Sequence, residues 1–298
     1  MGAVLDSLSQ PFFRRALLEA VLVGVLAGIV GVHVLLRRLP FFVVAMSHAT
    51  FPGVVLASIL GTSLFLGGSA FGLLVVLALV VLGTQRAVDD TSLIGVLLAG
   101  SFALGILLQS ARTGGSKELS AFLVGSVLTV TPADLVTTAL VGVVLLLGLG
   151  LTHKELVLTA FDRGGAAATG YRLRLVDLGL LAAVTVAMVT TIPVVGTLLA
   201  VALLTVPALT ARLWTDRIPP AMAIAAVVGA GSGVVGLALS ATYDIAAGGA
   251  IALTTAAAFT ASFVLTLPRS HRPRNTPLDS LDDLHGAPGT RGRGQSGV

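Results

Sequence analysis

Nine long apolar stretches, separated by short polar segments, run through most of the chain. We place them at 16–36, 40–61, 63–83, 92–111, 133–152, 174–192, 193–213, 221–240 and 248–267. Each is 19 to 22 residues long, close to the roughly 20 residues that a helix needs to cross a hydrocarbon core. The pattern predicts an all-α, polytopic transmembrane bundle of about nine spans, within a range of eight to ten. Because proline can also kink a helix, Pro193 leaves open a single element across 174–213.

Composition indicates that a lipid bilayer is the natural solvent of this chain. Hydrophobic residues make up 55% of its 298 residues and charged residues 11%, and the mean hydropathy is +1.01. A soluble domain is usually about a quarter charged. The absence of cysteine excludes disulfides and thiolate metal sites. The first 15 residues lack the basic start and short apolar core of a cleaved signal peptide, so we expect no cleaved leader.

Lysine and arginine are concentrated on one side of the predicted bundle. If the C-terminus is cytoplasmic, 14 of the 18 basic residues fall in cytoplasmic segments and 4 in outer segments. Cytoplasmic loops of membrane proteins carry an excess of basic residues, so the C-terminus and the segment 153–173 are predicted to be cytoplasmic. Arg14 and Arg15 are the discordant pair. The basic residues therefore mark topology, and despite a pI near 10.3 they argue against nucleic acid as a partner.

Two segments do not fit as spans. Residues 112–132 contain an apolar run at 119–128 that is too short to cross, so we expect a re-entrant or interfacial helix there. Residues 268–298 are rich in proline, glycine, arginine and serine and poor in large apolar residues. Such a segment cannot bury enough surface to fold, so a disordered cytoplasmic tail is predicted.

The segment HKELVLTAFDRGGAAATGYRLR, residues 153–174, is too polar for a span and too apolar for a solvated linker. Asp162 is a good N-cap, because its carboxylate can accept hydrogen bonds from the free amides of a first helical turn. Gly170 can adopt the left-handed conformation that ends a helix, and the alanines between them favour helix. We predict a short helix. Spacing alone leaves open whether another protein docks on it or it simply lies on the inner surface.

A histidine stands in the middle of the second apolar stretch, within the sequence AMSHATFPG. His48 follows Arg38 by ten residues, a rise of about 15 Å that places it near the bilayer midplane. Pro52 cannot donate to the carbonyl of His48, so a kink and a free carbonyl fall close to the imidazole and to the hydroxyls of Ser47 and Thr50. This grouping indicates a polar transport pathway, in which a neutral imidazole can bind a divalent ion. The alternative is a histidine that only packs beside the kink.

Several motifs in this order resemble the integral membrane subunits of manganese/zinc/iron ABC transporters. They are VHVLLRRLPFFVVAMSHATFPGVVLA (32–57), DDTSLIGVLLAGSFALGILL (89–108), FLVGSVLTVTPADL (122–135), FDRGGAAATG (161–170), VGTLLAVALLTVPALTARL (195–213) and LSATYDIAAGG (239–249). The resemblance extends from about Pro11 to Leu267. It implies an importer-type ABC permease domain at residues 1–267, multi-pass in the bacterial plasma membrane.

The resemblance also implies a mode of action. The family's Asp-x3-Ala-x3-Gly element falls on Asp162, Ala166 and Gly170, which implies that a helix at about 155–170 couples the permease to its ATPase. The implied partners are an ATP-binding cassette subunit, an extracellular solute-binding protein and a second copy of the chain. No cofactor is expected; the cargo would be a divalent zinc, manganese or iron ion, and ATP would be hydrolysed on a separate chain. The sequence agrees, since it contains no G-x4-G-K-[ST] loop.

The same resemblance assigns His48 to the metal pathway, in a Ser-His-x3-Pro-Gly setting that includes Pro52. The family usually has an aspartate four residues before this histidine, whereas this chain has Val44. Without that partner, ligands come from elsewhere, or the ion passes without firm coordination, or the cargo is not a bare ion. Glu19 and Asp244, near outer helix ends, are candidates for the entrance.

Other functions remain open at this stage. Because Val44 replaces the usual aspartate, a permease for a metal chelate such as a siderophore or haem is an open alternative. A secondary transporter or channel would need intramembrane acid–base pairs or inverted repeats, and a membrane enzyme would need polar residues clustered at a helix mouth. Neither pattern is clear in the sequence. His33, about one turn before Arg37, is expected to pack near the inner surface.

Overall fold

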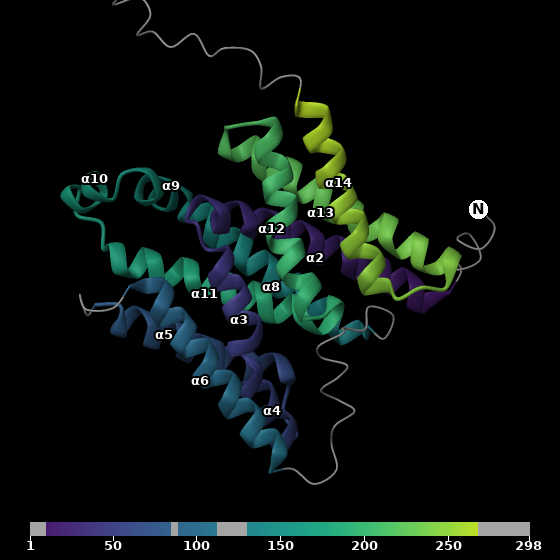
Figure 1. Ribbon diagram of the computed structural model, residues 1–298, viewed down its shortest axis with the longest axis horizontal. Coiled ribbons are helices and arrows are strands. Elements are labelled where there is room, and N and C mark those ends of the chain that lie inside the picture. The colour runs from purple at the N-terminus through teal and green to yellow at the C-terminus, as the bar shows by residue number, and fades with distance from the viewer. Residues whose placement is uncertain (1–9, 85–88, 112–129, 268–298) are drawn as a thin grey trace, which may run out of the picture.

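The computed structural model describes residues 10–84, 89–111 and 130–267, and within these ranges the chain is helical and contains no strand (Figure 1). The helices are α2 (Pro11–Leu36), α3 (Pro40–Ala49), α4 (Phe51–Leu60), α5 (Leu64–Leu82), α6 (Asp90–Ser110), α8 (Pro132–Leu151), α9 (His153–Phe161), α10 (Arg163–Ala168), α11 (Leu173–Val195), α12 (Thr197–Trp214), α13 (Ile218–Tyr243) and α14 (Ala247–Thr266). In the described part of the chain, nine helices are long and apolar enough to cross a membrane when α3 and α4 are taken together. The predicted all-α polytopic fold is confirmed. The expected helix at 119–128 and the expected tail at 268–298 lie outside the described residues.

The sixth and seventh predicted spans are two separate helices, and their boundary lies at Gly196, a few residues beyond the predicted split between Ile192 and Pro193. Helix α11 continues through Pro193 and ends at Val195. Gly196 has φ +86°, and its N–H donates to the carbonyl of Ile192 at 2.7 Å. A positive φ is readily available to glycine but costly for other residues. The chain therefore turns at the residue that can adopt this backbone conformation, and the proline remains inside the helix.

The second span is broken near its middle, as the proline predicted. Helix α3 ends at Ala49 and α4 begins at Phe51, with Thr50 between them. Pro52 occupies the first turn of α4, where its missing N–H is tolerated. The N–H of Thr50 donates to the carbonyl of Met46 at 3.2 Å. The span is therefore two stacked short helices that join beside His48.

Helix α2 lies inside the bundle and packs against α8, α11, α12 and α13. Its contact with α13 depends on small residues. A Cβ atom added at Gly24 would lie 2.6 Å from the backbone of Gly229, and one added at Gly28 would lie 2.5 Å from the carbonyl oxygen of Ala225. Such contacts let two helix backbones approach closely in lipid. These glycines hold the chain's own bundle together.

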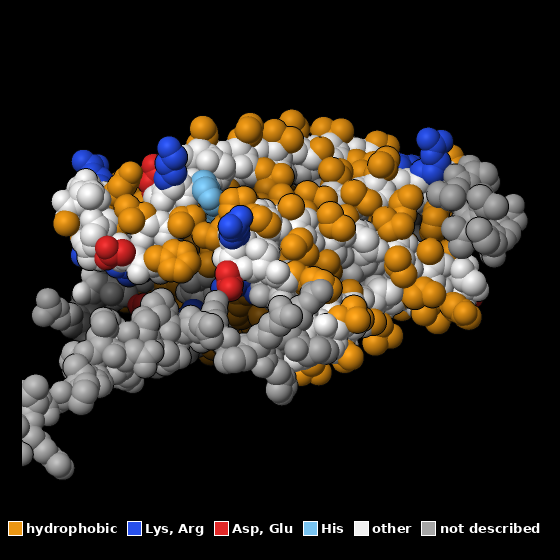
Figure 2. Space-filling view, turned by 90° about the horizontal axis from the view of Figure 1, so that it is seen from above, with side chains coloured by type: hydrophobic (Ala, Val, Ile, Leu, Met, Phe, Trp, Pro, Cys, Tyr) orange, Lys and Arg blue, Asp and Glu red, His pale blue; other side chains and the backbone are white. Residues whose placement is uncertain are grey.

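The surface of the bundle suits a bilayer. Figure 2 shows hydrophobic side chains over most of the visible face, with charged side chains gathered toward one end and a further basic group at the other. Helices α9 and α10 lie at the left of the bundle in Figure 1, and the start of α2 lies at the right. The predicted cytoplasmic loop and the predicted outer end are thus at opposite ends of the molecule.

Candidate functional site

His48 lies in the last turn of α3 and faces α6. Its side chain is half-buried, and its ring meets the ring of Phe102 edge to face, with centroids 5.5 Å apart. Phe102 also contacts Phe51, the first residue of α4, at 5.8 Å. One turn further along α6, a Cβ atom added at Gly105 would lie 2.4 Å from Phe51 and 3.2 Å from the nitrogen of Pro52. Helix α6 therefore covers the break in the second span.

The two hydroxyl groups beside His48 point to other neighbours. Ser47 is buried and donates to the carbonyl of Val44 in its own helix, at 2.7 Å. Thr50 is also buried, and its methyl group lies against Gly72 of α5, where an added Cβ would come within 3.0 Å of it. Among the described residues the hydroxyl of Thr50 has no hydrogen-bond partner. Ser47, His48 and Thr50 are therefore close in sequence, but their side chains face different neighbours: Ser47 its own helix, His48 α6 and Thr50 α5.

Val44 lies one turn before His48 and faces a groove. Its side chain is 39% exposed. The groove has a volume of about 340 Å³ and is bounded by α2, α3 and α12, with Phe41, Val201, Thr205 and Leu209 among its lining residues. None of the described residues that line the groove has a carboxylate or an imidazole. An aspartate at position 44 would therefore be the first acidic group in this groove.

The remaining titratable residues of the spans are dispersed. In the part of the chain that the structure describes, no three His, Asp or Glu residues lie close enough together to hold a metal ion. Glu19 is fully buried and bonded to Thr138 of α8, so it is not at an open entrance. Asp244 is exposed at the end of α13. His33 is buried and meets His153 of α9 edge to face at 6.2 Å, which agrees with a packing role near one end of the bundle.

The predicted short helix is present as α10, and its two ends are built as expected. Asp162 is the N-cap, and its carboxylate accepts from the N–H of Gly165 at 2.8 Å. Gly170 has φ +87°. Its N–H donates to the carbonyl of Ala167 at 3.1 Å, and the N–H of Tyr171 donates to the carbonyl of Ala166 at 3.1 Å. This is the paired bonding by which a left-handed glycine ends a helix.

Burial divides the residues of α10 into two faces. Ala166 is fully buried within its own chain, so it packs α10 onto the bundle and is not available to a partner. Gly164, Ala167 and Ala168 are exposed. Phe161, at the end of α9, is 72% exposed. A partner that docks here would therefore meet the exposed small residues and Phe161.

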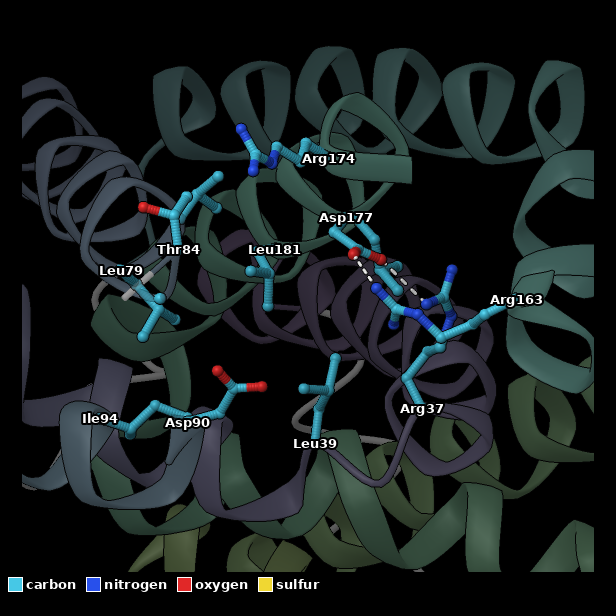
Figure 3. Close-up of a pocket in the computed structure, with 13 residues that line it drawn as sticks. Arg37, Leu39, Leu79, Thr84, Asp90, Ile94, Arg163, Arg174, Asp177 and Leu181 are labelled. Carbon is cyan, nitrogen blue, oxygen red and sulfur yellow. Dashed lines mark hydrogen bonds and ion pairs between the residues drawn. The ribbon is translucent and has the colours of Figure 1, made fainter. Parts of the chain in front are cut away.

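Three charged residues join this end of the molecule together (Figure 3). Arg37, directly after α2, donates from Nη1 to Oδ1 of Asp177 in α11 at 2.9 Å. Arg163, the first residue of α10, donates from Nη2 to Oδ2 of the same carboxylate at 2.6 Å. Arg37 also donates from Nη2 to the hydroxyl of Thr159 in α9. We call Arg37, Asp177 and Arg163 the Asp177 cluster.

The Asp177 cluster forms one side of a cavity of about 450 Å³. Arg174 and Asp90 are also in its lining, together with Leu79 and Leu181 (Figure 3). Burial lowers the pKa of the Arg37 guanidinium below its ordinary value, and the negative charge of Asp177 opposes that shift. Asp177 therefore compensates a cation that is largely withdrawn from water.

Sequence reasoning missed Asp177, Thr159 and Phe102. Asp177 carried a signal, because it is an acid within an otherwise apolar run, and such residues are usually paired or functional. Thr159 and Phe102 carried none, since threonine and phenylalanine are ordinary in helices of this composition. Their roles depend on which helices become neighbours.

The nine candidate spans of the described residues define a polytopic membrane protein. Residues 9–266 match the ABC 3 transport family. The chain belongs to this family, and it is accordingly a permease-type transport subunit.

Relatives of known name span most of the chain. The manganese transport system membrane protein MntC of Halalkalibacterium halodurans is 35% identical over 256 residues, which cover 86% of this chain and 88% of that protein. The zinc transport system membrane protein TroC of Treponema pallidum is 35% identical over 250 residues, covering 81% and 84%. Among solved structures, PsaBC from Streptococcus pneumoniae in complex with Fab superposes with a TM-score of 0.79 at 34% identity, covering 87% of this chain and 94% of that one. The resemblance drawn from the motifs is confirmed.

Proposed function

We propose that this chain is the membrane-spanning permease subunit of an ATP-driven importer for a divalent transition metal, zinc, manganese or iron, in the bacterial plasma membrane. The observation that carries the proposal is the family match over residues 9–266, together with relatives named for manganese and zinc transport. The chain supplies the path across the membrane. An ATP-binding cassette subunit hydrolyses ATP, and an extracellular solute-binding protein delivers the ion.

The geometry of α9 and α10 supports the proposal that the ATPase docks on this helix pair. The helix pair lies at one end of the bundle (Figure 1), and α10 is fixed at both ends by Asp162 and Gly170. Apart from Arg163 at its first position, its exposed residues are small, which allows a partner's surface to approach the backbone. Closure of the ATPase pair on ATP would displace this helix and switch the path between its two open states.

A second copy of the chain completes the proposed path. The apolar residues Phe41 and Val44 of α3 and Leu198 of α12 are exposed by 45%, 39% and 82%. They lie on two of the three helices that border the groove beside Val44. A second copy packed against this face would enclose the groove and place the path between the two α3 helices.

One observation favours an alternative cargo in place of a bare metal ion. Val44 stands where an acidic partner for His48 would be expected, and the described residues hold no group of three metal-binding side chains. A bare divalent ion would thus find His48 without an acidic partner one turn away. A metal chelate such as a siderophore or haem needs no such ligand, so a chelate permease is the alternative function.

Reconstitution separates these functions. The chain is purified with its ATP-binding subunit, placed in liposomes and supplied with its binding protein. Radioactive manganese, zinc and iron are offered as free ions, and iron is also offered as a siderophore complex and as haem. Uptake of a free ion that requires ATP supports the proposal.

Uptake of the chelate alone would favour the alternative cargo. Uptake that proceeds equally without ATP would reject the ABC mechanism and indicate a secondary transporter or channel. A matched control uses an ATP-binding subunit whose catalytic glutamate is replaced by glutamine, because it binds ATP without hydrolysing it.

A further inference from the structure

We propose that Asp177 and Arg163 are positioning residues that transmit the movement of α10 to α3, the helix that carries His48. This inference rests on the proposed function and names the residues through which ATP-driven motion reaches the path. The contacts that carry it belong to the Asp177 cluster, whose members come from three separate parts of the chain (Figure 3).

The carboxylate of Asp177 is divided between two cations. Its Oδ1 accepts from Arg37 at 2.9 Å, and its Oδ2 accepts from Arg163 at 2.6 Å. Arg163 belongs to α10 and Arg37 follows α2, while Asp177 itself lies in α11. One side chain therefore connects the proposed docking helix to two transmembrane helices.

Of the two ion pairs in the Asp177 cluster, the one between Arg37 and Asp177 is the more rigid. The Arg37 side chain is 9% exposed, and in the described part of the chain Asp177 is the acid that pairs with it. Moving Asp177 away would leave a buried cation uncompensated, which is strongly unfavourable. Arg37 also bonds to Thr159 of α9. The end of α2, α9 and α11 therefore move as one unit.

Arg37 is the first residue of the turn from α2 into α3. The turn consists of Arg37, Arg38 and Leu39, and α3 begins at Pro40. Arg38 has φ +56°, and the N–H of Leu39 donates back to the carbonyl of Val34 at 2.9 Å. These bonds fix the turn to the end of α2. A displacement of Arg37 is therefore passed to the start of the helix that bears Val44 and His48.

The ion pair between Arg163 and Asp177 connects the cluster to the proposed docking helix, α10. The Arg163 side chain is 59% exposed, and Asp177 is 25% exposed. Ion pairs with this much exposure contribute little to stability, so a variant at Arg163 should fold. The short distance and the position at the first residue of α10 suit an orienting contact, because an ion pair at the end of a short helix helps to set its angle.

The test compares coupling in three variants of the reconstituted complex. Arg163→Ala removes the contact to Asp177, and Arg163→Lys keeps a cation at this position. Arg174→Ala is the matched control, because Arg174 lines the same cavity and no ion pair is found for it among the described residues. ATP hydrolysis and metal uptake are measured together for each variant.

We expect Arg163→Ala to assemble with the ATPase and to hydrolyse ATP within about twofold of wild type, while metal moved per ATP falls about fivefold or more, the lower end of usual coupling between sites. Arg163→Lys should retain most of the wild-type ratio, and Arg174→Ala should match wild type. A purely structural role of Arg163 would instead lower complex yield and hydrolysis together with uptake. A wild-type ratio in Arg163→Ala, or an equal loss in Arg174→Ala, would overturn the proposal.

The absence of cysteine in this chain permits a second test. Arg163→Cys is treated with a positively charged aminoethyl methanethiosulfonate or with a negatively charged sulfonatoethyl methanethiosulfonate. The positive reagent should restore the uptake-to-hydrolysis ratio and the negative one should not, because the positive adduct can form an ion pair with Asp177 and the negative adduct is repelled by it. The wild-type complex, treated alike, reports any effect on the partner subunits. Equal restoration by both reagents would overturn the proposal.

A third measurement does not depend on the cargo. Val44→Cys is labelled with a water-soluble maleimide, with and without a non-hydrolysable ATP analogue. The labelling rate should change with the analogue, and adding Arg163→Ala should abolish that change. A nucleotide response that survives Arg163→Ala would reject transmission through this residue, even if no metal ion proves to be the cargo. Absence of ATP-dependent uptake in the wild type, by contrast, would reject the proposed function.

Discussion

Thr138 donates its hydroxyl to Glu19, which lies 119 residues earlier in the sequence, with 2.6 Å between Oγ1 and Oε1. The bond joins α8 to α2 inside the bundle. Glu19 is fully buried, and its other oxygen has no hydrogen-bond partner among the described residues. A buried polar group that loses its partner is expensive. This single bond therefore satisfies one oxygen of a buried acid whose other oxygen has no partner among the described residues.

Thr138→Val should lower the free energy of unfolding by about 1 to 3 kcal/mol, because it leaves the buried Glu19 without its donor. The measurement is the thermal unfolding midpoint in detergent. Glu19→Gln is the matched variant, since its amide oxygen can still accept from Thr138, and it should be more stable than Thr138→Val. If Thr138→Val unfolds at the wild-type temperature, the bond contributes nothing.

Substitutions on the two faces of α10 should have different effects. Ala167→Arg places a large cation on the exposed face, so the protein should fold and insert but lose its ATP-binding subunit during purification. Ala166→Arg forces a cation into a fully buried position, so the yield of folded protein should fall by itself. Copurification with the ATPase and the unfolding midpoint distinguish the two. Normal ATPase binding by Ala167→Arg would show that this face is not the docking surface.

The end of α10 offers a prediction of its own. Gly170→Val should destabilise the segment by roughly 1 to 2 kcal/mol, because φ +87° is unfavourable for a residue with a branched side chain. Gly179→Val is the control, since Gly179 is exposed and an added Cβ there meets nothing. We expect ATP hydrolysis to lose its response to cargo in the first variant alone. If ATP hydrolysis responds equally to cargo in both variants, the helix end at Gly170 is not needed for coupling.

His48 can be tested as a ligand separately from its role in packing. His48→Ala removes both the imidazole and the contact with Phe102, while His48→Phe keeps an aromatic ring for that contact. If the imidazole binds the cargo, both variants should lose roughly fivefold in metal uptake at matched expression, equivalent to about 1 kcal/mol of ion binding. Wild-type uptake by His48→Phe would return His48 to a packing role and favour a chelated cargo.

Val44→Asp is the complementary gain-of-function change. Position 44 is 39% exposed and faces the groove, so an acid there can be accommodated. Together with His48 one turn later it would form a two-residue site for a divalent cation. We expect tighter retention of manganese or zinc by the purified protein and slower release in uptake assays. Unchanged metal binding would show that the His48 side of α3 does not border the path of the ion.

Orientation in the membrane can be read with single cysteines. Ala168→Cys on α10 should resist membrane-impermeant maleimide in intact cells, because the charge distribution puts this end in the cytoplasm. Ser63→Cys, between α4 and α5, should react readily. Both residues are exposed, so neither result is decided by burial. The reverse labelling pattern would invert the topology.

The sequence by itself determined the spans and the local ends of helices. Apolar runs of about 20 residues favour membrane-spanning helices, because a helix satisfies the backbone polar groups of the run within the run itself. Asp162 and Gly170 fixed the ends of α10 for an equally local reason, since a cap bonds to amides or carbonyls within a few residues. Pro52 likewise marked the break in the second span. These features depend on neighbours in the chain.

Tertiary structure decided what the side chains face. Burial of Ala166, the direction of Thr50 toward α5 and of His48 toward α6, and the contact of Glu19 with Thr138 all follow from helix neighbours. The position of the break at Gly196 shows the same limit, because Pro193 was compatible with either a helix end or a helix interior. Arg37 and Asp177 pair across 140 residues. A local pattern records which residues are polar or small, but which distant helix meets them depends on how the whole bundle packs.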